Sequence, residues 1–279
     1  MLGLGVALGL GSAVAWGVGD FAGGIAAKRI GGMVVAGGSQ LTGFAILVVL
    51  LVALHPAPPS VTTLLLGGAG GICGGLGLAA LYRALAIGNM GIVSAVAGVG
   101  SAAIPLAVGV VLQGDVLGPP QIAGIGCALL AVAAASGATG QGLGRTSLLL
   151  AGLAAIGFGL WFVLLDLAAN GDQLWALVAS RGTAALLIGG VTLPWANRAA
   201  LRASARLMAA AGIADVTASG LVVLAFASIP VGIAAAVAGL YPLVTMLMAR
   251  IVIGEALPRL GMAAIAIAVI GIVLISIGG

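Results

Sequence analysis

Three charged residues lie inside long apolar stretches of the chain: Asp20, Arg181 and Asp215. A charge at the centre of an apolar span costs at least ~2.5 kcal/mol on insertion scales and usually faces a cavity or a partner. A shielded carboxyl group can take up and release a proton, because burial disfavours its charged form. Asp20 and Asp215 are therefore candidate proton-coupling residues, and Arg181 is a candidate ligand for a substrate carboxylate. These residues have structural alternatives to a functional role. Asp215 and Arg181 can form an ion pair that joins two helices, and Asp20 can lie near the water-exposed end of its helix.

Aromatic residues make up only 4% of the chain, and four of its six tryptophan and tyrosine residues lie within apolar stretches. A flat ring can hold an apolar group of a substrate, and the polar atom of an indole or phenol can orient it. We therefore take as candidate substrate-binding residues Trp16, Tyr82, Trp161, Arg181 and Tyr241. The alternative is anchoring at the membrane interface, which suits Trp175 and Trp195 near the ends of apolar stretches.

Two prolines also interrupt apolar stretches, Pro105 and Pro242. A proline inside a helix frees the carbonyl four residues earlier and permits a kink. Both are hinge candidates, and passive kinks are an equal alternative.

No arrangement typical of an enzyme is present. The one histidine, His55, lies in a Pro-rich segment away from the buried serines, and the two cysteines, Cys73 and Cys127, lie in apolar stretches. These positions favour neither a Ser/His dyad nor a disulfide or metal site. We expect no catalytic residue, no metal and no cofactor.

The composition is that of an integral membrane protein. Of 279 residues, 62% are hydrophobic and 6% are charged, and the mean hydropathy is +1.34. A water-facing surface uses roughly 25% charged residues, so most of this surface must face lipid. The apolar runs are long enough for helices of ~20 residues rather than the short alternating strands of a barrel. The sequence predicts an all-α membrane protein of ten transmembrane helices.

Polar and turn-forming breaks set the limits of these helices. The predicted spans are 2–27, 33–54, 62–86, 91–112, 119–138, 147–168, 173–195, 206–228, 232–252 and 258–277. Glycine supplies 49 residues, some of them four apart, as at Gly67, Gly71 and Gly75. Small residues at that interval allow helices to approach closely in lipid.

The two halves of the chain are similar to each other. Residues 91–98 match residues 232–239 at six of eight positions, and the same offset of 141 sets Gln40 against Arg181. Trp16 falls against Trp161, and Gly114-Asp115 against Gly254-Glu255, at nearly that offset. Four matches in one order predict two five-helix repeats, residues 1–140 and 141–279, within one membrane domain. Because five is odd, the repeats must be inverted, which is a recurring plan of secondary transporters.

Nine of the ten basic residues lie in or beside alternate loops, which with ten helices all face one side of the membrane: Lys28, Arg29, Arg83, Arg145, Arg198, Arg202, Arg206, Arg250 and Arg259. The net charge of +4 is thus a topology signal and does not indicate nucleic acid. The positive-inside rule puts both termini outside the cytoplasm.

The sequence resembles the EamA-like ten-helix transporters of the drug/metabolite transporter superfamily. The similarity runs from Gly3 to Ser276 and is carried by short motifs: Ala15-Trp16-Gly17, Ala84-Leu85-Ala86, Tyr241-Pro242 and Gly254-Glu255. The chain departs from the pattern at Asp115, where the family usually has Glu, and at Ser101, where a proline opposite Pro242 is expected. The resemblance implies a central cavity lined by helices 1, 3, 4, 6, 8 and 9, and cytoplasmic termini, against the charge rule.

What the resemblance implies about function is export or exchange of small metabolites. We expect alternating access in a multi-pass protein of the cell (plasma or inner) membrane, acting on amphipathic or zwitterionic solutes such as amino acids. A passive channel or facilitator is the alternative. Expected partners are a small-molecule substrate, the lipid bilayer and protons, and one copy of the chain is sufficient.

Overall fold

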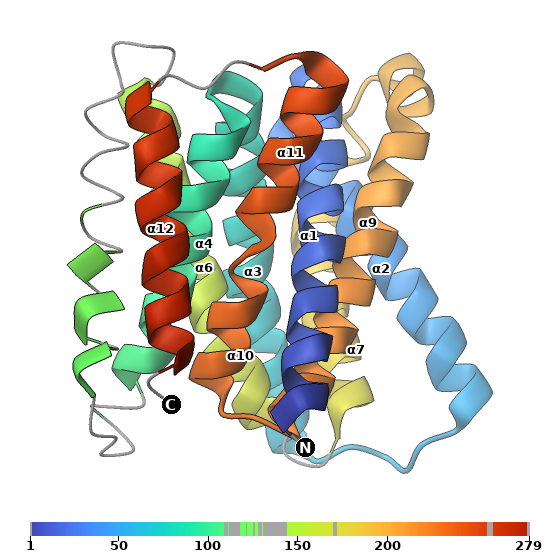
Figure 1. Ribbon diagram of the computed structural model, residues 1–279. Helices are drawn as coiled ribbons and strands as arrows, with labels where there is room; N and C mark the ends of the chain where they lie inside the picture. The colour runs from blue at the N-terminus through green and yellow to red at the C-terminus, as the bar shows by residue number, and fades with distance from the viewer. Residues whose placement is uncertain are drawn as a thin grey trace.

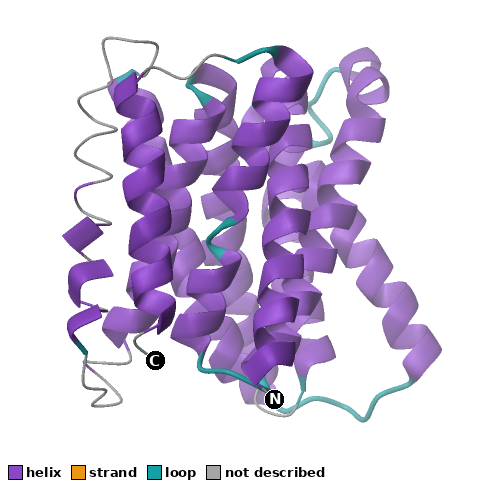
Figure 2. Cartoon of the chain, viewed as in Figure 1, coloured by secondary structure: helices purple, strands orange, loops and turns teal. Residues whose placement is uncertain are grey.

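Long apolar helices run up and down a single bundle. The computed structural model describes residues 2–108, 111, 118–120, 122–124, 126–127, 130, 144–169, 172–255 and 259–277. Figure 2 shows helices joined by short connections, and the described residues contain no strand. The chain begins and α12 ends at the same end of the bundle (Figure 1).

The helices of the first half are α1 (Leu2–Ile30), α2 (Gly32–Leu54), α3 (Val61–Ile87) and α4 (Met90–Val108). Those of the second half are α6 (Arg145–Ala168), α7 (Gln173–Ala184), α8 (Gly190–Thr192), α9 (Arg198–Phe226), α10 (Val231–Ala238), α11 (Tyr241–Ile253) and α12 (Arg259–Ile277). A π-helical segment, Ala185–Gly189, joins α7 to α8.

Seven segments of the described residues are long and apolar enough to cross a membrane. They are Gly3–Ile30, Gly32–Leu54, Val61–Ile87, Arg145–Ala168, Gln173–Thr192, Arg198–Phe226 and Val231–Ile253. Helices α4 and α12 lie on two further predicted spans. The fifth predicted span, 119–138, and Asp115 lie mostly or wholly outside the described residues. The protein is therefore an all-helical, multi-pass membrane protein.

Two helices differ from the predicted limits for local reasons. Helix α9 begins at Arg198 rather than at 206, because the Asn197 side chain accepts hydrogen bonds from the amides of Ala199 and Ala200 and so starts the helix early. The predicted span 232–252 is broken at Gly239-Leu240, between α10 and α11. Pro242 lies in the first turn of α11, where its missing N–H leaves no helical bond unmade.

Close approach of small residues brings the helices together, as the glycine spacing predicts. A Cβ on Gly67 would lie 2.8 Å from the carbonyl oxygen of Ala176 in α7. A Cβ on Gly157 of α6 would lie 2.6 Å from the carbonyl oxygen of Cys73 in α3. At these contacts the backbones themselves touch, and any side chain would force the helices apart.

The nine loop-associated basic residues gather at one end of the bundle. They lie where α1, α3 and α11 end and where α6, α9 and α12 begin. In Figure 1 this is the end opposite the N-terminus. The arrangement agrees with the alternation of loops expected from the sequence.

Candidate functional site

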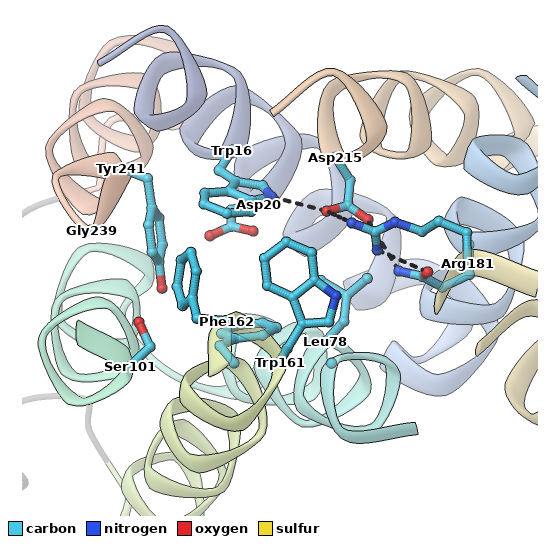
Figure 3. A pocket seen from close by; sticks show the side chains of 13 residues that line it. Trp16, Asp20, Leu78, Ser101, Trp161, Phe162, Arg181, Asp215, Gly239 and Tyr241 are labelled. Atoms are coloured by element: carbon cyan, nitrogen blue, oxygen red, sulfur yellow. Dashed lines mark hydrogen bonds and ion pairs between the residues drawn. The ribbon is translucent and has the colours of Figure 1, made fainter. Parts of the chain in front are cut away.

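A cavity lies near the middle of the bundle, between the two halves of the chain. The space in and at the mouth of this cavity that is not filled by atoms is about 510 Å³, open solvent included. Its aromatic lining consists of Trp16, Phe158, Trp161, Phe162 and Tyr241. Its polar lining consists of Asp20, Gln40, Ser101, Arg181 and Asp215, and Gly74, Leu78 and Gly239 complete it (Figure 3). These residues come from α1, α2, α3, α4, α6, α7, α9 and the α10–α11 junction.

Arg181 and Asp215 form a buried ion pair across α7 and α9. Arg181 Nη1 lies 2.8 Å from Asp215 Oδ2, and Nη2 donates to Oδ1 at 3.2 Å. The two side chains are only 6% and 10% exposed. A two-point contact of this kind is the strong form of an Arg–carboxylate pair. The pairing expected as one alternative from the sequence is therefore present.

Gln40 and Trp16 extend the ion pair into the first half of the chain. Gln40 Oε1 accepts from Arg181 Nη1 at 2.9 Å, and Gln40 Nε2 donates to Asp215 Oδ2 at 3.1 Å. Trp16 Nε1 donates to Asp215 Oδ1 at 3.0 Å. The carboxylate of Asp215 thus receives hydrogen bonds from three different helices, and its charge is fully compensated.

Ser219 completes this network one turn beyond Asp215. Its hydroxyl accepts from Arg181 Nη2 and donates to the carbonyl oxygen of Asp215 at 2.7 Å. Neither Gln40 nor Ser219 was a predicted site residue. Gln40 could have been found as the residue aligned with Arg181 in the repeat, and Ser219 as the polar residue one helical turn from Asp215.

Asp20 stands apart from this network although it lies one helical turn after Trp16. Its residue is 4% exposed, and its Oδ2 atom makes no hydrogen bond within the described part of the chain. The hydroxyl of Tyr241 is also without a hydrogen-bond partner among the described residues. The cavity therefore contains one carboxyl group paired with an arginine, Asp215, and one, Asp20, with an oxygen that bonds no described group.

The aromatic lining is a cluster centred on Trp16. The Trp16 ring centre lies 5.9 Å from that of Trp161, 5.7 Å from Phe162 and 6.4 Å from Tyr241, all in edge-to-face geometry. Such pairs are favourable because the positive ring edge meets a negative ring face. The Trp161 indole donates to Ser180 Oγ at 3.1 Å, and the guanidinium carbon of Arg181 lies 5.7 Å from the Trp161 ring centre.

Glycines make room for this cluster. A Cβ on Gly74 would lie 2.6 Å from Cδ1 of Trp161, so α3 can carry no side chain there. A Cβ on Gly98 of α4 would lie 2.9 Å from Pro242 Cγ and 3.0 Å from the carbonyl oxygen of Gly239. Helix α4 therefore crosses the α10–α11 break in backbone contact at the cavity wall.

Six of the seven predicted binding or proton-coupling residues line the cavity, and Tyr82 does not. Tyr82 is 1% exposed and packs against Gly23 of α1. Among the hinge candidates, Pro105 lies inside α4, and Pro242 follows the cavity residue Tyr241 at the start of α11. Trp195 is 87% exposed, and Trp175 donates to the carbonyl oxygen of Ala57 at 2.8 Å; their role at the membrane interface stays a prediction.

Comparison with known proteins supports a transporter fold. The solved structures that match include a crystal structure with a TM-score of 0.69 and 16% identity; the match covers 98% of this chain and 97% of that one. At that identity the likeness shows the fold alone. No curated protein matches the chain. The model of the EamA-like transporter family, a family of transporters rather than enzymes, matches residues 145–277. The second half of the chain is thus an EamA-like transporter family domain.

Proposed function

We propose that this protein is a secondary transporter of small organic metabolites that works by alternating access, as an exporter or an exchanger. The observation that carries the proposal is a buried cavity, lined from both halves of an EamA-like multi-pass chain, near the middle of its helices. Secondary transporters place their sites near the bilayer midplane at the interface between repeats. The chain carries both halves, so one copy is sufficient.

The proposal includes ten helices in two inverted repeats. Contacts between aligned residues support it. Arg181 hydrogen-bonds Gln40, Trp161 packs on Trp16, and the Gly98 and Gly239 backbones meet. Residues on a two-fold axis contact their own equivalents. Helix α1 packs along α9 just as its counterpart α6 packs along α3, which is the helix pairing that a two-fold relation requires.

The break between α10 and α11 supports movement around the cavity. Discontinuous helices are typical of transporter sites, where unpaired backbone groups line the cavity. Gly239 lies at this break and in the cavity wall. We propose that Pro242, and Pro105 in the facing helix α4, are hinge residues for the rocking of one half against the other.

Coupling to protons is part of the proposal, and the geometry favours Asp20 over Asp215. Asp215 is held by Arg181, Gln40 and Trp16, so loss of its charge would leave a buried guanidinium unpaired. Asp20 lines the cavity, and its Oδ2 has no hydrogen-bond partner among the described residues. Asp215 as a coupling residue remains a prediction.

The membrane concerned is proposed to be the cell membrane. If the end that carries the nine basic residues faces the cytoplasm, both termini lie outside; the family resemblance places them inside. A reporter fused at the C-terminus distinguishes the two orientations.

Solute counterflow in proteoliposomes tests the function. Vesicles are loaded with an unlabelled pool of amino acids and metabolites, and uptake of each labelled solute is followed. A carrier exchanges labelled for unlabelled solute and shows a saturable, transient accumulation. Uptake that is unaffected by the internal pool would instead establish a passive facilitator, the alternative function.

A further inference from the structure

We propose that the cavity is built for an organic monocation: a solute with an apolar or aromatic body whose positive charge is held by Asp20. This inference rests on the proposed function and names its substrate class. It changes the expectation from the sequence, in which Arg181 binds a substrate carboxylate and the solute is an amino acid.

The charged side chains in the described lining of the cavity are one arginine and two aspartates, so one aspartate has no basic partner there. Arg181 is the one basic residue in the described lining, and it is joined to Asp215 by an ion pair and a second hydrogen bond. Arg181 Nε makes no hydrogen bond among the described residues, but the guanidinium charge is already paired with Asp215. A substrate carboxylate bound there would make two buried carboxylates share one positive charge, which is unfavourable. The two charges cancel within the network, and Asp20 remains.

Asp20 is presented as a ligand-binding group. It is 4% exposed, lines the cavity, and its Oδ2 has no partner among the described residues. A buried carboxylate is unfavourable unless it is paired and hydrogen-bonded. Figure 3 shows the carboxylate turned into the space beside Trp16 and Tyr241. An ammonium group entering this space would supply the positive charge that the protein does not, and one that carries N–H groups would supply hydrogen-bond donors as well.

The walls around Asp20 suit a cation as well. Aromatic faces attract cations electrostatically, most strongly where water is excluded, and Trp16, Phe162 and Tyr241 lie around one another at ring-centre distances of 5.7 and 6.4 Å. The unpaired hydroxyl of Tyr241 offers an acceptor for a second N–H. Apart from Ser101 and the Gln40–Arg181–Asp215 network, the rest of the lining is apolar, which suits the body of an amphipathic solute.

Equilibrium binding to the purified full chain in detergent tests the inference with ligands that share one ring and differ in charge. The labelled probe is trimethyl(phenethyl)ammonium, whose charge does not titrate. The competitors are phenethylamine, phenylalanine, phenylacetate and 2-phenylethanol. We expect the probe to bind, phenethylamine to displace it, and the zwitterion, the anion and the alcohol to be weaker competitors by about tenfold or more. Absence of probe binding, or displacement by phenylalanine at the concentration at which phenethylamine acts, overturns the inference.

Variants locate the charge. Asp20→Asn keeps the shape and removes the charge, and we expect it to weaken probe binding by about tenfold or more. The matched control is Asp166→Asn, which removes the carboxylate at the similar position of α6, outside the cavity lining; its affinity should equal that of wild type. Equal affinities in all three proteins would overturn the assignment to Asp20. If the variants do not fold, the ligand panel measured on the wild-type protein still tests the inference.

Counterflow with the same ligands separates the inference from the proposed function. Binding of the probe through Asp20 without exchange would support the substrate class and refute a transporter. Exchange of phenylalanine without binding of either cation would support a transporter and refute the substrate class.

Discussion

Arg181 donates a hydrogen bond of 2.9 Å to Gln40, the residue 141 positions earlier with which it aligns in the sequence repeat. The bond joins the two halves of the chain inside the cavity wall. Because Asp215 bonds both residues, this one cluster connects α2, α7 and α9. Its composition also decides what the cavity can bind, since it occupies the only arginine of the described lining.

The Arg181–Asp215 pair should be needed for stability as a pair. Removing one partner from a buried ion pair typically costs 3–5 kcal/mol, because the other charge stays buried and uncompensated. We expect Asp215→Ala to lower the free energy of unfolding in detergent by about that amount. The double variant Arg181→Met/Asp215→Leu should recover most of the loss, since neither charge remains. Additive losses in the double variant would contradict the pairing.

The indole N–H groups of Trp16 and Trp161 should contribute different amounts to the free energy of unfolding. Trp16 donates to the charged Asp215, whereas Trp161 donates to the neutral hydroxyl of Ser180. Hydrogen bonds to charged groups contribute about 1.5–3 kcal/mol, against about 0.5–1.5 kcal/mol for neutral ones. Each Trp→Phe variant loses the bond and keeps most of the ring. Thermal unfolding should therefore show a larger loss for Trp16→Phe than for Trp161→Phe; the reverse order would be inconsistent with the network.

The crossing of α4 with the α10–α11 break should not tolerate a side chain. In Gly98→Ala the new Cβ would lie 2.9 Å from Pro242 Cγ and 3.0 Å from the carbonyl oxygen of Gly239. Overpacking of this kind costs about 1–3 kcal/mol. The matched control is Gly220→Ala in α9, where a Cβ meets nothing within 4 Å. Alanine there should be neutral or stabilising by up to about 1 kcal/mol, and equal destabilisation by both variants would argue against the crossing.

Glu255 should make stability depend on pH at the basic end of the bundle. Its Oε1 accepts from the Met90 amide at the start of α4 at 2.7 Å. Burial raises the pKa of Glu255, against smaller opposing effects of the Met90 hydrogen bond and the Lys28 charge. A raised folded-state pKa means that this contribution to stability is full below the unfolded pKa and is lost as pH rises through the folded pKa.

The test of that prediction is Glu255→Gln, which keeps the oxygen acceptor and removes the titration. Relative to this variant, the wild-type unfolding temperature should fall as the pH is raised from about 4 to 8, because the unfolded chain releases the Glu255 proton first. Parallel pH curves for the two proteins would show that Glu255 does not titrate differently on folding.

Much of the fold follows from the sequence because it depends on simple periodic patterns. Apolar runs long enough to span lipid, and turn residues between them, predict most helices to within a few residues. Hydropathy alone does not indicate the break at Gly239-Leu240, because the apolar pattern continues through it. The kink expected at Pro242 does indicate it, since a proline there cannot bond the carbonyl of Ala238. The π-helical segment after Arg181 likewise has no signal in hydropathy.

The site was predicted in its residue types and only partly in its contacts. Buried charges and aromatic residues are rare in this chain, so Asp20, Arg181 and Asp215 could be selected without a structure. Which carboxylate pairs with Arg181 depends on the relative rotation of α1, α7 and α9 about their axes. A single sequence does not determine such rotations, although the repeat alignment and the helical spacing did point to Gln40 and Ser219.

Accessibility of one cavity residue from each side of the membrane tests the central claim most directly. Ser101 lines the cavity and is 2% exposed, and Ser101→Cys can be made in a protein whose Cys73 and Cys127 are replaced by serine. Alternating access predicts that an impermeant thiol reagent modifies this cysteine from either face, and that transported solute slows both reactions. Modification from only one face, whatever solute is present, would mean that the cavity is a dead-end pocket and would contradict the account.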